Sequence, residues 1–190
     1  MYMSSILYLD QMRNSRMVLH EVYFWTDTVK DWKKLFHPDK YKELILEEWA
    51  KLVQNGFVTI YGFVIMPNHL HVIWEMQKKN GKEMPHASFN KATGHRVVKD
   101  LKQCHPRVLP HFRVDEKERE FRIWQRDPLA VWLDAKEKCL QKLNYLHLNP
   151  LHERWGLADR PEEYKWSSAR FYQTGEDEFG FLTHLAERFG

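Results

Sequence analysis

Two histidines separated by one residue, His69 and His71, are the side chains of this sequence best suited to metal chemistry. They follow a Pro67-Asn68 turn and begin the run HLHVIWEM, whose β-branched and aromatic residues predict a strand over residues 69–76. Side chains two positions apart project from the same face of a strand, so both imidazoles can reach one metal ion. The alternative is a pair of partly buried polar side chains without a ligand, although unpartnered imidazoles inside a sheet are costly to bury.

The second candidate is a tyrosine in a predicted helix over residues 134–149, which ends at Asn149-Pro150. The apolar stripe of this helix is predicted to consist of Cys139, Leu140, Leu143 and Leu146. Tyr145 lies away from that stripe, and Asn149 follows one turn later on the same face. A tyrosine hydroxyl, with a pKa of about 10, is a poor nucleophile unless a cation or a metal-bound substrate assists it. A metal on the histidine pair would give that assistance; the alternative is an ordinary surface tyrosine.

The elements that must position these side chains follow from periodicity and turn residues. In chain order we expect strand 16–26, helix 39–54 with Asp39 as its N-cap, strand 57–66, strand 69–76, helix 87–104 with Val97, Val98, Leu101 and Cys104 on its apolar face, and strand 118–126. The order βαββαβ predicts an α+β, ferredoxin-like (RRM-like) antiparallel sheet with two helices on one face. The helix over residues 134–149 and a loop-rich extension are added after this core.

Composition is that of one globular domain. The chain has 190 residues, 43% of them hydrophobic and 29% charged, with a net charge of +3. Two cysteines, Cys104 and Cys139, are too few for a disulfide framework, which favours reduced thiols and a cytoplasmic protein. The N-terminal residues Asp10, Arg13 and Arg16 and the lack of a long apolar run indicate neither a signal peptide nor a membrane partner.

The positive charge is concentrated in residues 78–126, which hold 13 Lys and Arg against 6 Asp and Glu. Within this segment one predicted helical face carries Lys91, His95, Lys99 and Lys102. Such a face is suited to a phosphate backbone, but it is also typical of a solvated helix. Trp124 with Gln125, and Trp166 with its two following serines, are candidates for stacking on or hydrogen bonding to bases; the alternative is that both tryptophans anchor the core.

Three stretches resemble a known family. The run YGFVIMPNHLHVIWEM, the pair Trp124-Gln125 and the run YLHLNPLHERWGLADRPEEYKWSS are similar to those of the IS200-like Y1 transposases, which are HUH enzymes. More narrowly, the chain resembles the REP-associated tyrosine transposases. The resemblance extends from about residue 16 to about residue 172. Its most specific parts are MPNHLH and the Tyr-x-His-x-Asn-Pro motif followed by Trp-Ser-Ser.

The resemblance implies roles for the candidate residues. His69 and His71 would bind Mg²⁺ or Mn²⁺, Asn149 would complete the metal site, and Tyr145 would be the nucleophile. The implied reaction cleaves and rejoins single-stranded, REP-like hairpin DNA through a 5′-phosphotyrosine intermediate, without a nucleotide cofactor. Residues 1–150 would form the catalytic domain, and residues 151–190 an extension packed on it.

Two other functions remain open at this point. The first is a domesticated module that binds DNA or RNA hairpins without cleaving them, although the complete set of metal and nucleophile candidates argues against it. The second is a hydrolytic metal nuclease, in which Tyr145 would have no chemical role. The sequence also leaves open whether the protein is a monomer or a homodimer, and which DNA hairpin it recognises.

Overall fold

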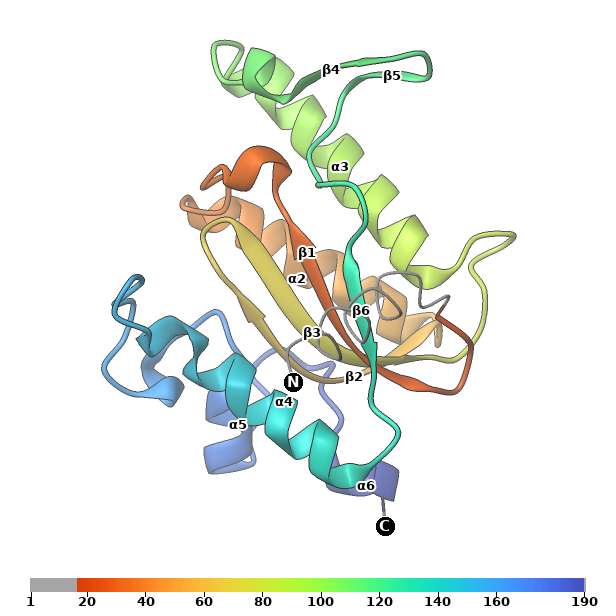
Figure 1. Cartoon of the computed structure of the whole chain (residues 1–190), viewed down its shortest axis with the longest axis vertical. Helices are drawn as coiled ribbons and strands as arrows, with labels where there is room; N and C mark the ends of the chain where they lie inside the picture. The colour runs from red at the N-terminus through yellow and green to blue at the C-terminus, as the bar shows by residue number, and fades with distance from the viewer. Residues whose placement is uncertain (1–16, 190) are drawn as a thin grey trace, which may run out of the picture.

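The computed structural model describes residues 17–189 and shows a four-stranded antiparallel sheet with helices on both faces (Figure 1). The elements are, in chain order, β1 (Val22–Thr28), η1 (Lys30–Trp32), α2 (Asp39–Gln54), β2 (Val58–Ile65), β3 (His69–Met76), α3 (Pro85–Cys104), η2 (Leu109–Phe112), β4 (Arg113–Glu116), β5 (Arg119–Phe121), β6 (Leu129–Trp132), α4 (Lys136–Leu148), η3 (Asn149–Leu151), η4 (Pro161–Glu163), α5 (Ala169–Thr174) and α6 (Ala186–Phe189). The N-terminal positions named above, Asp10, Arg13 and Arg16, lie outside the described residues.

The strands of the main sheet lie in the order β2-β3-β1-β6, and every neighbouring pair is antiparallel. β3 lies between β1 and β2, which is the strand order of a split βαβ unit. The α+β class and the four-stranded antiparallel sheet expected from the sequence are therefore confirmed.

The predicted strand over residues 118–126 is wrong. Its first part pairs as β5 with β4 in a separate two-stranded sheet, at the end of α3 far from the main sheet (Figure 1). Beyond β5, Ile123 and Trp124 are both buried outside any strand of the main sheet. The fourth strand is instead β6, only four residues long and paired with β1 alone, so it gives little alternation to detect.

Several boundaries and faces also differ from the prediction. β1 begins at Val22, six residues later than expected. The N-cap of α2 is Pro38; Asp39 is the first helical residue, and its carboxylate accepts a hydrogen bond from Lys42. Cys104 and Leu140 are exposed, although both were expected on apolar faces. No helix within residues 17–189 combines the length and apolarity needed to cross a bilayer.

α2 and α3 cover one face of the sheet through an aromatic cluster. Trp25 of β1 and Trp74 of β3 stack with ring centroids 4.9 Å apart. Phe89 of α3 contacts both rings and stacks on Trp49 of α2 at 5.7 Å. All four side chains are buried, so this face is occupied by core packing and leaves no room for a catalytic site.

α4 covers the opposite face, and the C-terminal segment runs along the outer edge of β2. The Trp-Ser-Ser motif pairs with the outer edge of β2, because the backbone nitrogen of Ile65 donates to Trp166 and that of Ser168 donates to Phe63. Phe181 from the same segment is buried in the core cluster. The extension thus contributes to the sheet edge and to the core.

Gly62 lets α4 approach β2 closely. The β2–β3 register shifts between Ile60 and Gly62. A Cβ at Gly62 would lie 2.6 Å from Cδ1 of Leu143 on α4 and 3.2 Å from Oγ of Ser168. Any larger residue here would have to displace the buried side chain of Leu143 and disturb the packing of α4 on the sheet.

We expect Gly62→Ala to lower the free energy of unfolding by about 1–3 kcal/mol, because the added methyl group overpacks the α4–β2 contact. Gly94→Ala is the matched control: a Cβ at this position in α3 meets no described atom within 4 Å. It should stabilise the protein by about 0.4–1 kcal/mol through the reduced entropy of the unfolded chain. Urea unfolding measures both changes, and equal stability of the two variants would contradict the proposed fit of α4.

Candidate active site

The two histidines lie side by side on the face of β3 that α4 covers. Their ring centroids are 4.8 Å apart, and His69 and His71 are only 3% and 5% exposed. The Nδ2 amide of Asn68 donates to the carbonyl of Trp32, which directs its Oδ1 atom to Nδ1 of His69 at 2.7 Å. An amide oxygen only accepts, so Nδ1 of His69 carries the proton and Nε2 keeps its lone pair.

His71 is held in a similar way from the neighbouring strand. Thr26 lies directly opposite His71 in the β1–β3 register, and its Oγ1 atom is 2.7 Å from Nδ1 of the imidazole. The Nε2 atom of His71 is buried and makes no hydrogen bond to any residue in the described part of the chain. Buried polar atoms without a partner are rare, and an unpartnered imidazole nitrogen fits a metal ligand.

Both imidazoles are held in the neutral form. Burial lowers the pKa of His69 to about 4, and the nearby positive charge of Arg154 acts in the same direction. The pKa of His71 lies well below its ordinary value because of burial, with smaller contributions from the charges of His69, Lys142 and Arg154. At neutral pH the pair therefore offers uncharged nitrogen donors, the form in which histidine binds metals.

Tyr145 stands next to this pair on α4. Its ring centroid is 5.6 Å from that of His71 and 5.9 Å from that of Phe24, which itself stacks on His71 at 5.0 Å. Tyr145 is 41% exposed, so part of its surface is open to solvent. The ammonium of Lys142 lies 5.5 Å from the centroid of the Tyr145 ring, in a cation–π contact.

Asn149 begins the turn that follows α4, and it is completely buried. Neither atom of its amide group makes a hydrogen bond within residues 17–189. Tyr145, four residues earlier, contacts His71; Trp155, six residues later, contacts His69 at 5.9 Å between ring centroids. The segment that contains Asn149 therefore passes over the histidine pair.

The donor set is two imidazoles and one amide. In the described part of the chain, no group of three or more His, Cys, Asp or Glu side chains gathers in a way that would hold a metal ion. Nε2 of His71 and the amide of Asn149 have no partner among residues 17–189. With the imidazole of His69 they are the side chains that could hold a divalent cation and leave positions for phosphate oxygens or water.

The sequence did not reveal what positions α4. Nε2 of His147 lies 2.8 Å from Oγ of Ser168, which also accepts a hydrogen bond from the backbone nitrogen of Phe63 on β2. This chain of hydrogen bonds ties the helix of the candidate nucleophile to the sheet. His147 is part of the Tyr-x-His-x-Asn-Pro motif and Ser168 is part of the Trp-Ser-Ser motif. Their place in these motifs is the sequence feature that could have indicated a structural role. Asn68 and Thr26, which orient the imidazoles, were likewise not assigned.

The basic face of α3 borders a groove of about 1280 Å³. Lys91, His95, Lys99 and Lys102 all line it and are all exposed. The opposite wall is the segment over residues 116–126. It brings three guanidinium groups, from Arg119, Arg122 and Arg126, to the single carboxylate of Glu116.

The three remaining candidates for DNA contact are engaged within the fold. Trp124 is 5% exposed, its Nε1–H donates to Oγ1 of Thr93, and its ring contacts Phe36 and Phe89. A base cannot stack on it without displacing these neighbours.

Trp166 and Gln125 have similar structural roles. Trp166 is 6% exposed and lies under the ammonium groups of Lys42 and Lys165, at 5.0 and 4.6 Å. Gln125 lines the groove, but its Oε1 atom accepts a hydrogen bond from the backbone nitrogen of Asp31. Burial thus corrects the stacking role considered for both tryptophans and favours the alternative, that they anchor the core.

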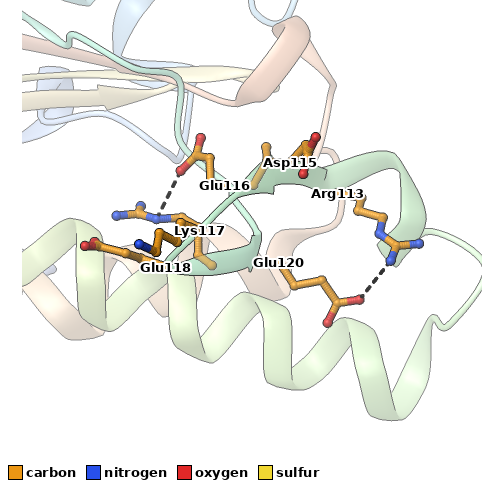
Figure 2. Close-up of a pocket in the computed structure, with 8 residues that line it drawn as sticks. Arg113, Asp115, Glu116, Lys117, Glu118 and Glu120 are labelled. Carbon is orange, nitrogen blue, oxygen red and sulfur yellow. Dashed lines mark ion pairs between the residues drawn. The ribbon is translucent and has the colours of Figure 1, made fainter.

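A second hollow, of about 840 Å³, is lined by residues 113–120 of the β4–β5 hairpin alone. Figure 2 shows that its side chains are almost all charged, with ion pairs drawn from Glu116 and from Arg113 to Glu120. No residue of β3 or α4 borders this hollow, so it is separate from the candidate active site.

The fold and the site together define an α+β protein with a histidine pair on the central sheet and a tyrosine-bearing helix across it. The chain is similar in structure to a REP-associated tyrosine transposase bound to a REP hairpin, with a TM-score of 0.59 over 88% of each chain and 14% sequence identity. At this identity the likeness concerns the fold, and at that level it confirms the resemblance seen in the sequence. The sequence itself matches no protein-family model and no curated protein.

We expect the metal-free protein to lose stability as the pH falls from about 6.5 toward 4, because the unfolded chain then binds protons that the buried neutral histidines do not. Burial lowers the pKa of His147 to about 4, so this residue alone should contribute a slope of about 1.4 kcal/mol per pH unit in that window. His147→Gln keeps a hydrogen-bonding group but does not titrate, and should reduce the slope measured by urea unfolding. His95→Gln, at an exposed position of α3, is the control. An unchanged slope in His147→Gln would contradict the assignment of this pH dependence to His147.

Proposed function

We propose that this protein is a metal-dependent strand transferase that cleaves and rejoins single-stranded or hairpin DNA through Tyr145. The observation that carries the proposal is the exposed tyrosine ring 5.6 Å from a buried, neutral imidazole whose Nε2 atom has no partner in the described chain. A nucleophile beside an open cation site is the arrangement that phosphoryl transfer requires.

His69, His71 and Asn149 are the residues that would hold the cation, Mg²⁺ or Mn²⁺. When bound, the ion would polarise the scissile phosphate and stabilise charge on the leaving oxygen. Two neutral imidazoles and an amide do not compensate the charge of a divalent ion, so the site favours an anionic ligand such as phosphate. Orientation of the rings by Asn68 and Thr26 fixes the donor atoms before substrate arrives.

The hydroxyl oxygen of Tyr145 attacks phosphorus in line with the leaving group. A P–O bond to the tyrosine forms as its hydroxyl releases its proton to solvent, and the bond from phosphorus to the 3′ oxygen breaks. That oxygen takes up a proton from solvent and leaves as a 3′-OH, so no net proton is gained or lost. The product is a 5′-phosphotyrosine, which conserves the energy of the phosphodiester. A second DNA 3′-OH can therefore displace the tyrosine and rejoin strands without a nucleotide cofactor.

The groove along α3 is the proposed binding surface for the DNA backbone. Its basic α3 residues and the arginines of the opposite wall supply phosphate contacts. Glu83, which pairs with Lys91, and the lining residues Glu116, Glu118 and Glu120 neutralise part of that charge. The ferredoxin-like core of residues 1–150 would carry both groove and active site, with residues 151–190 as the extension packed on it. The free thiols of Cys104 and Cys139 fit a cytoplasmic protein.

A covalent adduct tests the proposed chemistry. With Mn²⁺ and a hairpin labelled at the 3′ end of its single-stranded extension, a denaturing gel should show a protein–DNA band. Tyr145→Phe and chelation of the metal should each abolish the band, and His71→Ala should reduce it by about 100-fold, because oriented metal ligands contribute at that scale. Tyr41→Phe, on the opposite helical layer, is the control and should keep the band.

The alternatives give different results in the same assay. Cleavage without an adduct would favour a hydrolytic nuclease, and binding of several hairpins without cleavage would favour a non-cleaving module. Either result obtained with active metal and folded protein would overturn the proposed reaction.

The groove predicts a salt-dependent affinity that is separate from the chemistry. Replacing Lys99 and Lys102 together by Gln should weaken hairpin binding and make its dependence on salt shallower, by about 0.7–0.9 in log–log slope for each phosphate that the variant no longer neutralises. Lys51→Gln on α2, exposed and outside the groove, should change neither. Fluorescence anisotropy over a range of salt concentrations measures both quantities; an unchanged slope in the double variant would place the DNA elsewhere.

A further inference from the structure

One exposed tryptophan lies at the metal-site end of the sheet. Trp32 and Trp132 are the tryptophans with large exposure, 60% and 50%. The ring of Trp32 lies 6.3 Å from that of His69, edge to face. Trp132 is at the other end of β1, opposite Tyr23, whereas His69 is opposite Thr28. Of the two, only Trp32 presents an open indole face beside the candidate active site.

The backbone that presents Trp32 is strained. Asp31 and Trp32 have φ angles of 55° and 56°, a left-handed conformation that bulky side chains rarely adopt. Three hydrogen bonds hold it: from the nitrogen of Trp32 to the carbonyl of Val29 at 2.9 Å, from Nδ2 of Asn68 to the carbonyl of Trp32 at 3.2 Å, and from the nitrogen of Asp31 to Oε1 of Gln125 at 3.2 Å. Strain held in this way concentrates at functional sites.

The same hydrogen bonds connect Trp32 to both parts of the proposed DNA path. Asn68 also orients the imidazole of His69, and Gln125 lines the groove. Trp32 therefore stands between the groove that would hold the hairpin and the cation site that would hold the scissile phosphate.

Positive charge surrounds this position. The ammonium groups of Lys30 and Lys33 both contact Oδ2 of Asp31, at 2.6 and 2.7 Å. One carboxylate shared by two ammonium groups leaves a net positive charge beside the indole, which suits the phosphate of a nucleotide whose base lies on the ring.

We propose that Trp32 is a stacking platform for a nucleobase of single-stranded DNA next to the phosphodiester that Tyr145 attacks. The inference rests on the proposed function and adds a residue that positions its substrate. An exposed, strained tryptophan does little for the core, whereas an indole face stacks on any base. Stacking fixes the base, and the phosphate attached to it is thereby held near the histidine pair.

A fluorescent base analogue tests the proposal. The hairpin of the adduct assay carries one 2-aminopurine, moved one nucleotide at a time along its single-stranded extension, and is bound to Tyr145→Phe protein with Mg²⁺. We expect quenching at a position beside the bond that wild-type protein cleaves, and loss of that quenching when Trp32→Ala is added. Trp132→Ala, the matched control, should leave the quenching pattern unchanged.

Further variants separate stacking from simple bulk. In protein that retains Tyr145, Trp32→Phe should form the adduct nearly as fast as wild type at low DNA concentration. Trp32→Leu, which is apolar but without an aromatic face, should be slower by about 5- to 150-fold. Equal rates for Trp32→Leu and wild type, or quenching that persists at every position in Trp32→Ala, would overturn the proposal. Absence of an adduct from wild-type protein would refute the strand transfer instead, while quenching specific to Trp32 would still support the platform.

Discussion

The register of β3 between its two neighbours is the constraint on which the site depends. His71 pairs with Thr26 on one side and with Val64 on the other, which directs both imidazoles to the α4 face. The alternate residues, such as Trp74, then fill the aromatic cluster under α2 and α3. A slip of one residue would exchange the two sets and place imidazoles in an apolar core. Core packing on one face therefore fixes the histidine pair on the other.

The position of the nucleophile depends on a second, weaker set of contacts. α4 reaches the sheet because Gly62 has no side chain, and the hydrogen bond between His147 and Ser168 ties it to the β2 edge. Neither contact touches a substrate. Both hold α4, and with it Tyr145, against the sheet face that carries His71, so the geometry of the candidate site depends on residues whose role is structural.

The segment after β1 connects the α3 groove with the histidine pair. Its backbone is hydrogen bonded to the groove wall through Ile123 and Gln125, and through Asn68 to the residue that orients His69. A DNA strand that leaves the groove and reaches the histidine pair would pass this segment. Its strained turn thus lies between the α3 groove and the sheet face that carries the histidine pair.

The amino-acid sequence determined the local geometry: strand alternation places His69 and His71 on one face, and helical periodicity separates Tyr145 from the stripe of Leu143 and Leu146, both of which are buried. Those patterns depend only on near neighbours in the chain, so they can be predicted. Tertiary structure decided which surfaces meet: that α4 covers the histidine face, that a four-residue strand closes the sheet, that Trp124 is buried and that the turn at Trp32 is left-handed. These features arise from contacts between residues far apart in the sequence, whose packing no local pattern encodes.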